Sequence, residues 1–136
     1  MSLATGVLIK ENHVVSAGSV GEAVSRAKRS APEDVIVECE VRNLAELEEA
    51  IKAGADAVLL DNMSDELIGE CASFAKNFAA DVFVEASGNM TLDRVASPSK
   101  FANVGLSAVS VGALTHSRPY ADLSMLMDLH KASSDG

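Results

Sequence analysis

The chain has 136 residues, which is the size of one domain with a substantial core. Hydrophobic residues make up 48% of the chain and aromatic residues only 4%, a balance typical of helix-covered parallel sheets. The formal net charge of −9 argues against nucleic acid and anionic membrane surfaces as partners, because both repel a surplus of carboxylates. No apolar run reaches the roughly 18 residues of a membrane span, and the start does not have the layout of a signal peptide.

The chain contains two cysteines, Cys39 and Cys71, and they do not form a CxxC motif. Isolated cysteines suit a reducing cytosol better than a disulfide framework, so we expect two buried thiols in a cytoplasmic protein. No spacing of histidines and cysteines supports a tetrahedral zinc site.

The first predicted strand covers residues 6–10 and is followed by a polar cluster at residues 11–13. A loop is then expected to lead to Ser19, a plausible cap for a helix over residues 20–30 that Pro32 ends.

The second predicted strand covers residues 35–41 and carries two acids, Glu38 and Glu40, on one face, because residues two apart in a strand point the same way. Such a pair is unfavourable unless the carboxylates are solvated, paired or used. Asn43, with Glu46 three residues later, predicts the start of a helix that ends at Gly54.

The central stretch is a predicted strand over residues 57–60 that stops at Asp61 and Asn62. Ser64 opens a predicted helix over residues 65–78, and a strand over residues 82–86 again ends beside an acid. Ser87, Gly88 and Asn89 make the turn that follows.

In the last third of the chain, Thr91 caps a predicted helix that Gly105 ends and that residues 97–99, Ser-Pro-Ser, interrupt. The last predicted strand covers residues 108–111 and leads into a turn over residues 112–116. A final helix is expected over residues 122–130.

This alternation predicts an α/β fold in which about five parallel strands and their helices form either a doubly wound sheet or part of a barrel. Right-handed crossovers bring the carboxyl ends of parallel strands to one rim. The polar and small residues expected to converge there are Lys10, His13, Glu40, Asp61, Glu85, Ser87, Gly88, Gly112 and His116.

Several kinds of chemistry fit these residues. Glu40 and Asp61 could hold sugar hydroxyls or a hydrated Mg²⁺, or could be two solvated acids at strand ends. Lys10 could neutralise an anionic substrate or simply pair with Glu40. The turns near Gly88 and Gly112 could expose backbone N–H groups to a phosphate, or could be ordinary tight turns.

The strand ends fall within five ordered motifs: Leu8-Ile9-Lys10-Glu11-Asn12-His13, Glu38-Cys39-Glu40-Val41, Leu59-Leu60-Asp61-Asn62-Met63, Glu85-Ala86-Ser87-Gly88 and Ser110-Val111-Gly112-Ala113-Leu114-Thr115-His116. Together these motifs resemble those of the quinolinate phosphoribosyltransferases, also called carboxylating nicotinate-nucleotide pyrophosphorylases. The resemblance implies a Mg²⁺-dependent reaction of quinolinate with 5-phosphoribosyl 1-pyrophosphate that releases pyrophosphate and CO₂ and gives nicotinate mononucleotide for NAD synthesis.

The resemblance also implies roles for individual residues. Lys10 and His13, within the same motif, would contact the substrate, with Lys10 on a quinolinate carboxylate. Glu40 and Asp61 would be the catalytic pair, facing the ribose and holding its metal directly or through water. The phosphate end would be surrounded by Ser87, Gly88, Asn89, Gly112 and His116. Carboxylates near the ribose carbon would stabilise the positive charge that develops there during substitution.

Two departures from the family pattern stand out. Residues 1–136 correspond to a single partial barrel domain, and the family's amino-terminal domain and first barrel strands, with the cations that grip the substrate's carboxylates, are expected outside it. Asn89 stands where the family usually has a glycine, although asparagine tolerates a left-handed turn.

Two interpretations therefore stay open. The chain is the barrel portion of a phosphoribosyltransferase, with the isolated chain inactive or weakly active, or it is a half-barrel binding module that dimerises to cover its sheet edges. A molybdenum-associated relative of the same fold is a further alternative.

Overall fold

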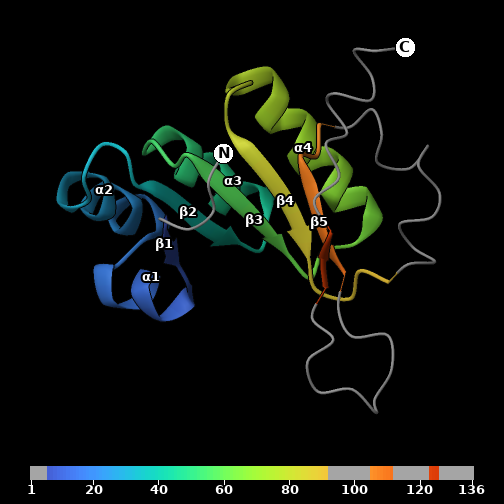
Figure 1. Ribbon diagram of the computed structural model, residues 1–136, viewed down its shortest axis with the longest axis horizontal. Coiled ribbons are helices and arrows are strands. Elements are labelled where there is room, and N and C mark those ends of the chain that lie inside the picture. Colours follow the sequence, from blue (N-terminus) through green and yellow to red (C-terminus); the bar gives the residue numbers. More distant parts are fainter. Residues whose placement is uncertain (1–5, 92–104, 112–122, 126–136) are drawn as a thin grey trace.

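The computed structural model describes residues 6–91, 105–111 and 123–125. Its strands form one sheet in the order β1-β2-β3-β4-β5-β6 (Figure 1). The strands are β1 (Gly6–Ile9), β2 (Ile36–Val41), β3 (Ala57–Asp61), β4 (Phe83–Ser87), β5 (Ala108–Val111) and β6 (Leu123–Met125). The helices are α1 (Glu11–Ala17), α2 (Val20–Ser30), α3 (Leu44–Lys52) and α4 (Asp65–Phe78).

Strands β1 to β5 run parallel, and β6 runs antiparallel to β5. The predicted α/β fold of five parallel strands, arranged as part of a barrel, is confirmed. The parallel strands send their carboxyl ends to one rim, seen toward the bottom of Figure 1.

Alternation along the strands sorts side chains onto two faces. One face is apolar and packs against the helices: Val37, Cys39, Val41, Val58 and Leu60 have no exposed surface. Helices α2, α3 and α4 add Val24, Leu47, Ile68, Cys71 and Ala75 to this core. Both free thiols are buried, and burial raises the pKa of Cys39 to about 12 and that of Cys71 to about 11.

The other face, here called the polar face, is half-buried and carries most of the charged groups of the sheet. Its half-buried members are Leu8, Glu38, Glu40, Leu59, Asp61, Phe83, Glu85, Ser87 and Ser110. The acids of β2 are therefore directed away from the helix-covered core, as their spacing of two requires.

Three helices begin at the caps that the sequence predicts. Ser19, Asn43 and Ser64 each accept a hydrogen bond through the side-chain oxygen from the backbone N–H three residues later, at 3.1, 2.8 and 3.2 Å. Each cap satisfies one of the backbone donors that a helix start leaves unpaired. Among the described residues, no helix is both long and apolar enough to cross a membrane.

Residues 11–17 correct one prediction, because they form helix α1 and not a loop. The His13 Nδ1 accepts a hydrogen bond at 3.0 Å from the backbone N–H of Lys10, and Gly18 ends the helix with φ of 103°. Seven residues are too few to show helical periodicity, so this local bond and the packing of Val14 against the core decide the conformation.

Residues 123–125 correct another, because they form strand β6 where a helix over residues 122–130 was predicted. The strand pairs Val109 with Met125 and Val111 with Leu123, so it satisfies backbone groups along the outer edge of β5. A tertiary partner of this kind overrides a weak helical pattern. The predicted helix over residues 91–105, with its break, and the turn over residues 112–116 lie almost wholly outside the described residues.

At the amino ends of the strands, Asp56 ties two strands and a helix together. Its Oδ2 accepts a hydrogen bond from the backbone N–H of Val37 at 2.9 Å, and both carboxylate oxygens lie 3.1 Å from Lys28 Nζ. This connection lies at the end of the sheet opposite the rim.

Gly54 and Gly105 provide a matched test of what glycine does at tight turns, because both have φ of 100°. A Cβ at Gly54 would meet nothing within 4 Å, whereas one at Gly105 would lie 2.8 Å from the carbonyl oxygen of Ala72 in α4. Backbone strain predicts that Gly54→Ala lowers the free energy of unfolding by about 1–2 kcal/mol. The clash at Gly105 should add about 1–3 kcal/mol to that loss in Gly105→Ala. Urea unfolding of both variants measures the difference, and equal losses would contradict the packing of α4 against this turn.

Candidate active site

The strand register brings the predicted acids to the rim. Glu40 pairs with Leu59 in β3, and Asp61, two residues further along β3, pairs with Ser87 at the end of β4. All three polar side chains are half-buried and lie on the polar face. Glu40, Asp61 and Ser87 thus form a continuous polar edge across three neighbouring strands.

The electrostatics of Glu40 connect it to two other predicted residues. Burial raises the pKa of Glu40 above its ordinary value of 4.5, and the negative charge of Asp61 raises it further. The cations Lys10 and Arg42 act in the opposite direction and lower the pKa of Glu40. The charges of Lys10 and Asp61 thus act on Glu40 in opposite directions.

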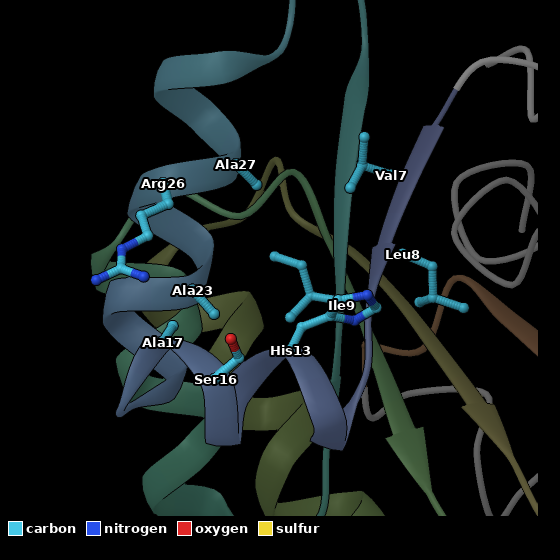
Figure 2. A pocket seen from close by; sticks show the side chains of 9 residues that line it. All are labelled: Val7, Leu8, Ile9, His13, Ser16, Ala17, Ala23, Arg26 and Ala27. Atoms are coloured by element: carbon cyan, nitrogen blue, oxygen red, sulfur yellow. The ribbon is translucent and has the colours of Figure 1, made fainter.

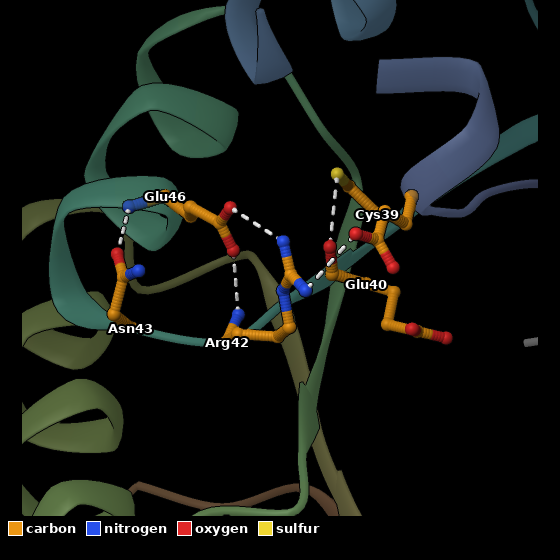
Figure 3. A network of polar contacts seen from close by, with 6 residues as sticks. Cys39, Glu40, Arg42, Asn43 and Glu46 are labelled. Carbon is orange, nitrogen blue, oxygen red and sulfur yellow. Dashed lines mark hydrogen bonds and ion pairs between the residues drawn. The ribbon is translucent and has the colours of Figure 1, made fainter. Parts of the chain in front are cut away.

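Arg42 follows β2 directly and is held in place by acids from two helices. Its Nη1 lies 3.3 Å from Glu11 Oε1 in α1, its Nη2 lies 3.8 Å from Glu46 Oε2 in α3, and its backbone N–H donates to Glu46 Oε1 at 2.8 Å. In Figure 3 the Glu40 carboxylate extends away from the Arg42 guanidinium. Arg42 thus acts on Glu40 through its charge and keeps the end of β2 attached to its neighbours.

The turns that follow β3 and β4 are joined to each other. The backbone N–H of Asn62 donates to the carbonyl of Ser87 at 2.9 Å, and Asn89 Nδ2 donates to Asn62 Oδ1 at 2.6 Å. A Cβ at Gly88 would lie 2.9 Å from the Asn62 nitrogen, so only glycine fits there. Asn89 does adopt the left-handed conformation that asparagine tolerates, with φ of 55°.

Deeper on the polar face, a second pair of acids lies across the sheet. Burial raises the pKa of Glu38 above 4.5, and the charge of Glu85 adds to this effect. The Ser110 hydroxyl in β5 donates a hydrogen bond to the Glu85 carboxylate. The face that leads down from the rim is therefore lined by acids that are only partly solvated.

His13 accepts a hydrogen bond from the backbone N–H of Lys10, but its ring belongs to a different surface. Its ring lines a pocket between β1, α1 and α2, together with Ser16, Arg26 and apolar side chains (Figure 2). Its assignment to substrate binding stays a prediction, and those of Gly112 and His116 fall outside the described residues.

Comparison with known proteins assigns the chain to a family. The family model of the quinolinate phosphoribosyl transferase C-terminal domain matches residues 1–126. The chain belongs to this family. It is 37% identical to the probable carboxylating nicotinate-nucleotide pyrophosphorylase of Bacillus subtilis, over 94% of this chain and 42% of that protein. The human carboxylating nicotinate-nucleotide pyrophosphorylase is 40% identical over 88% of this chain and 39% of that protein.

Solved structures agree with the assignment to the quinolinate phosphoribosyl transferase family. The nicotinate-nucleotide pyrophosphorylase from Francisella tularensis superposes with a TM-score of 0.67 at 38% identity, over 93% of this chain and 41% of that one. The chain thus spans about two fifths of the length of the curated relatives it matches.

Two further residues, Arg42 and Asn62, make contacts at the rim that the sequence pattern did not indicate. Arg42 could have been found by the rule that identified Lys10, because both come directly after a strand. The Asn62 side chain accepts a hydrogen bond from Asn89, which lies 27 residues further along the chain. A contact over this separation leaves no short-range pattern in the sequence.

Glu40 and Asp61 offer oxygen ligands, which suit a hard cation that keeps most of its waters. Among the described residues, no three histidine, cysteine or acidic side chains gather into a metal site, which leaves this pair of interacting carboxylates. Mg²⁺ binds through one or two carboxylates and keeps several waters, so the pair fits a largely hydrated Mg²⁺.

The opposite charges of Asp61 and Lys10 predict pKa shifts of opposite direction at Glu40 when each is removed. Asp61→Asn removes a negative neighbour and is expected to lower the pKa of Glu40, whereas Lys10→Met removes a cation and is expected to raise it. The measurement is an NMR titration of the side-chain carboxyl carbons. Asp56→Asn, at the opposite end of β3, serves as the control and should leave the titration of Glu40 unchanged; a shift in the same direction for both test variants would refute the arrangement.

The raised pKa of Glu38 predicts how stability depends on pH. Because the pKa of Glu38 is higher in the folded chain than its ordinary 4.5, ionisation favours the unfolded chain, and the associated stability is lost as the pH rises above 4.5. Glu38→Gln is therefore expected to raise the melting temperature at about pH 7, with a gain that shrinks toward about pH 4. Thermal melts across this range check the result, with Glu70→Gln on the exposed side of α4 as the control. A gain independent of pH would contradict the assignment.

Proposed function

We propose that this chain supplies the phosphoribosyl-binding part of a carboxylating nicotinate-nucleotide pyrophosphorylase. The reaction joins quinolinate to 5-phosphoribosyl 1-pyrophosphate and releases pyrophosphate and CO₂, which leaves nicotinate mononucleotide for NAD synthesis. The observation that carries this proposal is the strand register that puts Glu40, Asp61 and Ser87 on one rim, in a chain 37–40% identical to proteins named for that activity. Family membership alone would not assign roles to these residues.

The rim supports a division of roles. Glu40 and Asp61 face the ribose, where their negative charge stabilises the positive charge that develops on the ring as the pyrophosphate departs. Lys10 offers its cation to a carboxylate of quinolinate. The turn of Ser87, Gly88 and Asn89 lies beside Asp61, where it meets the phosphate end of the same molecule.

Glu40 and Asp61 would also hold Mg²⁺, directly or through water. When bound, Mg²⁺ supplies positive charge that balances the charge of the pyrophosphate group. The carboxylates themselves keep the ribose hydroxyls oriented, and no nucleophilic side chain is needed for direct substitution.

Assembly and location follow from the same proposal. The outer edge of β1 has no strand partner among the described residues. Further barrel strands would cover this edge in a TIM-type barrel, and a second copy of this chain would cover it in a homodimer. The soluble substrates and the two reduced cysteines fit the cytoplasm.

A calorimetric titration tests the ribose assignment. The purified chain should bind 5-phosphoribosyl 1-pyrophosphate in the presence of Mg²⁺, and Asp61→Ala should weaken binding roughly 10- to 100-fold, since hydrogen bonds to a charged group are lost. Asp81→Ala removes the same charge from an exposed acid just before β4, at the other end of the sheet, and should leave the affinity unchanged. Equal affinities for Asp61→Ala and the unchanged chain would exclude the assignment.

The activity itself is read from pyrophosphate release with quinolinate, 5-phosphoribosyl 1-pyrophosphate and Mg²⁺. Turnover that Asp61→Ala abolishes would support a catalytic chain. Binding without turnover would instead identify a chain that requires the rest of the barrel, and absence of both would favour a half-barrel interaction module.

A further inference from the structure

The turns after β3 and β4 concentrate the backbone strain of the described chain at one place. Asn62 and Asn89, with φ of 54° and 55°, are the two non-glycine residues with positive φ in the described ranges. Both follow a strand on the carboxyl-end rim, and one of them directly follows Asp61. Left-handed conformations are unfavourable for residues with a Cβ, and they persist where the surroundings hold them and often where function uses them.

Three contacts hold the two turns together. The Asn62 N–H donates to the Ser87 carbonyl, the two asparagine side chains hydrogen bond at 2.6 Å, and the backbone of Gly88 approaches Asn62 so closely that a Cβ would lie 2.9 Å from its nitrogen. Both asparagine side chains are exposed, so this connection is made on the surface of the rim and not in the core.

Asparagine suits both positions for the same reason. Its short amide side chain tolerates the left-handed conformation, and it can both donate and accept a hydrogen bond across the gap between the turns. Glycine would adopt the same backbone conformation but could not make the connection.

We propose that Asn62 and Asn89 are positioning residues that fix the distance between Asp61 and the turn of Ser87 and Gly88. This inference rests on the proposed function, in which Asp61 contacts the ribose of 5-phosphoribosyl 1-pyrophosphate and the turn contacts its phosphate end. One ligand then meets two groups on different strands, so a fixed separation between these groups lowers the entropy lost on binding. The hydrogen bond between the asparagine side chains affects binding by positioning Asp61 and the turn. The asparagines themselves do not contact the reacting atoms.

The test uses glycine substitutions, because glycine keeps the left-handed backbone and removes only the amide. In calorimetric titrations with 5-phosphoribosyl 1-pyrophosphate and Mg²⁺, Asn62→Gly and Asn89→Gly are each expected to weaken binding about three- to tenfold. The double variant should bind no more weakly than the weaker single variant, because either change alone already breaks the same bond. Thermal denaturation verifies that every variant is folded.

The control is Asp56→Ala, which removes a hydrogen bond between strands at the opposite end of the sheet. It is expected to lower stability while keeping the affinity, which separates positioning from a general loss of stability. Weakening by Asn89→Gly but not by Asn62→Gly would mean that Asn89 contacts the ligand directly and would overturn the proposal. Additive losses, or unchanged affinity in both single variants, would overturn it as well.

The two proposals fail differently. If the unchanged chain does not bind 5-phosphoribosyl 1-pyrophosphate, the proposed function is overturned and the positioning role is overturned with it. If the unchanged chain binds and the asparagine variants bind equally well, only the positioning role is lost.

Discussion

The parallel register of β1 to β5 is the constraint on which the rest of the structure depends. Parallel strands in register place all carboxyl ends at one rim, and the alternation of side chains sends neighbouring residues to opposite faces. Val41 and Leu60 are therefore fully buried under the helices, while Glu40 and Asp61, one position away in each strand, lie on the polar face. A slip of one residue in either strand would bury the acids and expose the core.

Collecting acids on one face has an electrostatic cost that the fold offsets only in part. Near the rim, Lys10 and Arg42 oppose the repulsion between Glu40 and Asp61, and Glu11 and Glu46 hold Arg42 in place. Deeper in the sheet, the described contacts of Glu85 include the neutral Ser110 hydroxyl, and burial together with the charge of Glu85 keeps the pKa of Glu38 above its ordinary value. Carboxyl groups with perturbed pKa values cluster at functional sites.

Much of this arrangement could be predicted because it depends on short-range patterns. Strand alternation located the core, and the caps at Ser19, Asn43 and Ser64 act over three residues. The location of Glu40 and Asp61 at one rim followed from topology alone, since parallel strands share an end.

The features that could not be predicted depend on contacts that spacing does not encode. Helix α1 has seven residues and lacks a periodic signal, and β6 exists because β5 offers it an edge. The side-chain bond between Asn62 and Asn89 joins two turns whose proximity is a result of the fold. Likewise, the effect of Arg42 on the pKa of Glu40 depends on where its guanidinium lies, and the ion pairs with α1 and α3 decide that position.

The buried thiols described with the core have a practical consequence for labelling. Reaction with maleimides or iodoacetamides needs the thiolate, and with pKa values of about 12 and about 11 only about one in 10⁴ or fewer of the thiols of Cys39 and Cys71 is ionised near neutral pH. A cysteine introduced on an exposed surface would therefore react far ahead of both native ones. A fluorophore or spin label could thus be attached to a cysteine introduced at the rim, and Cys39 and Cys71 could stay in place in the core.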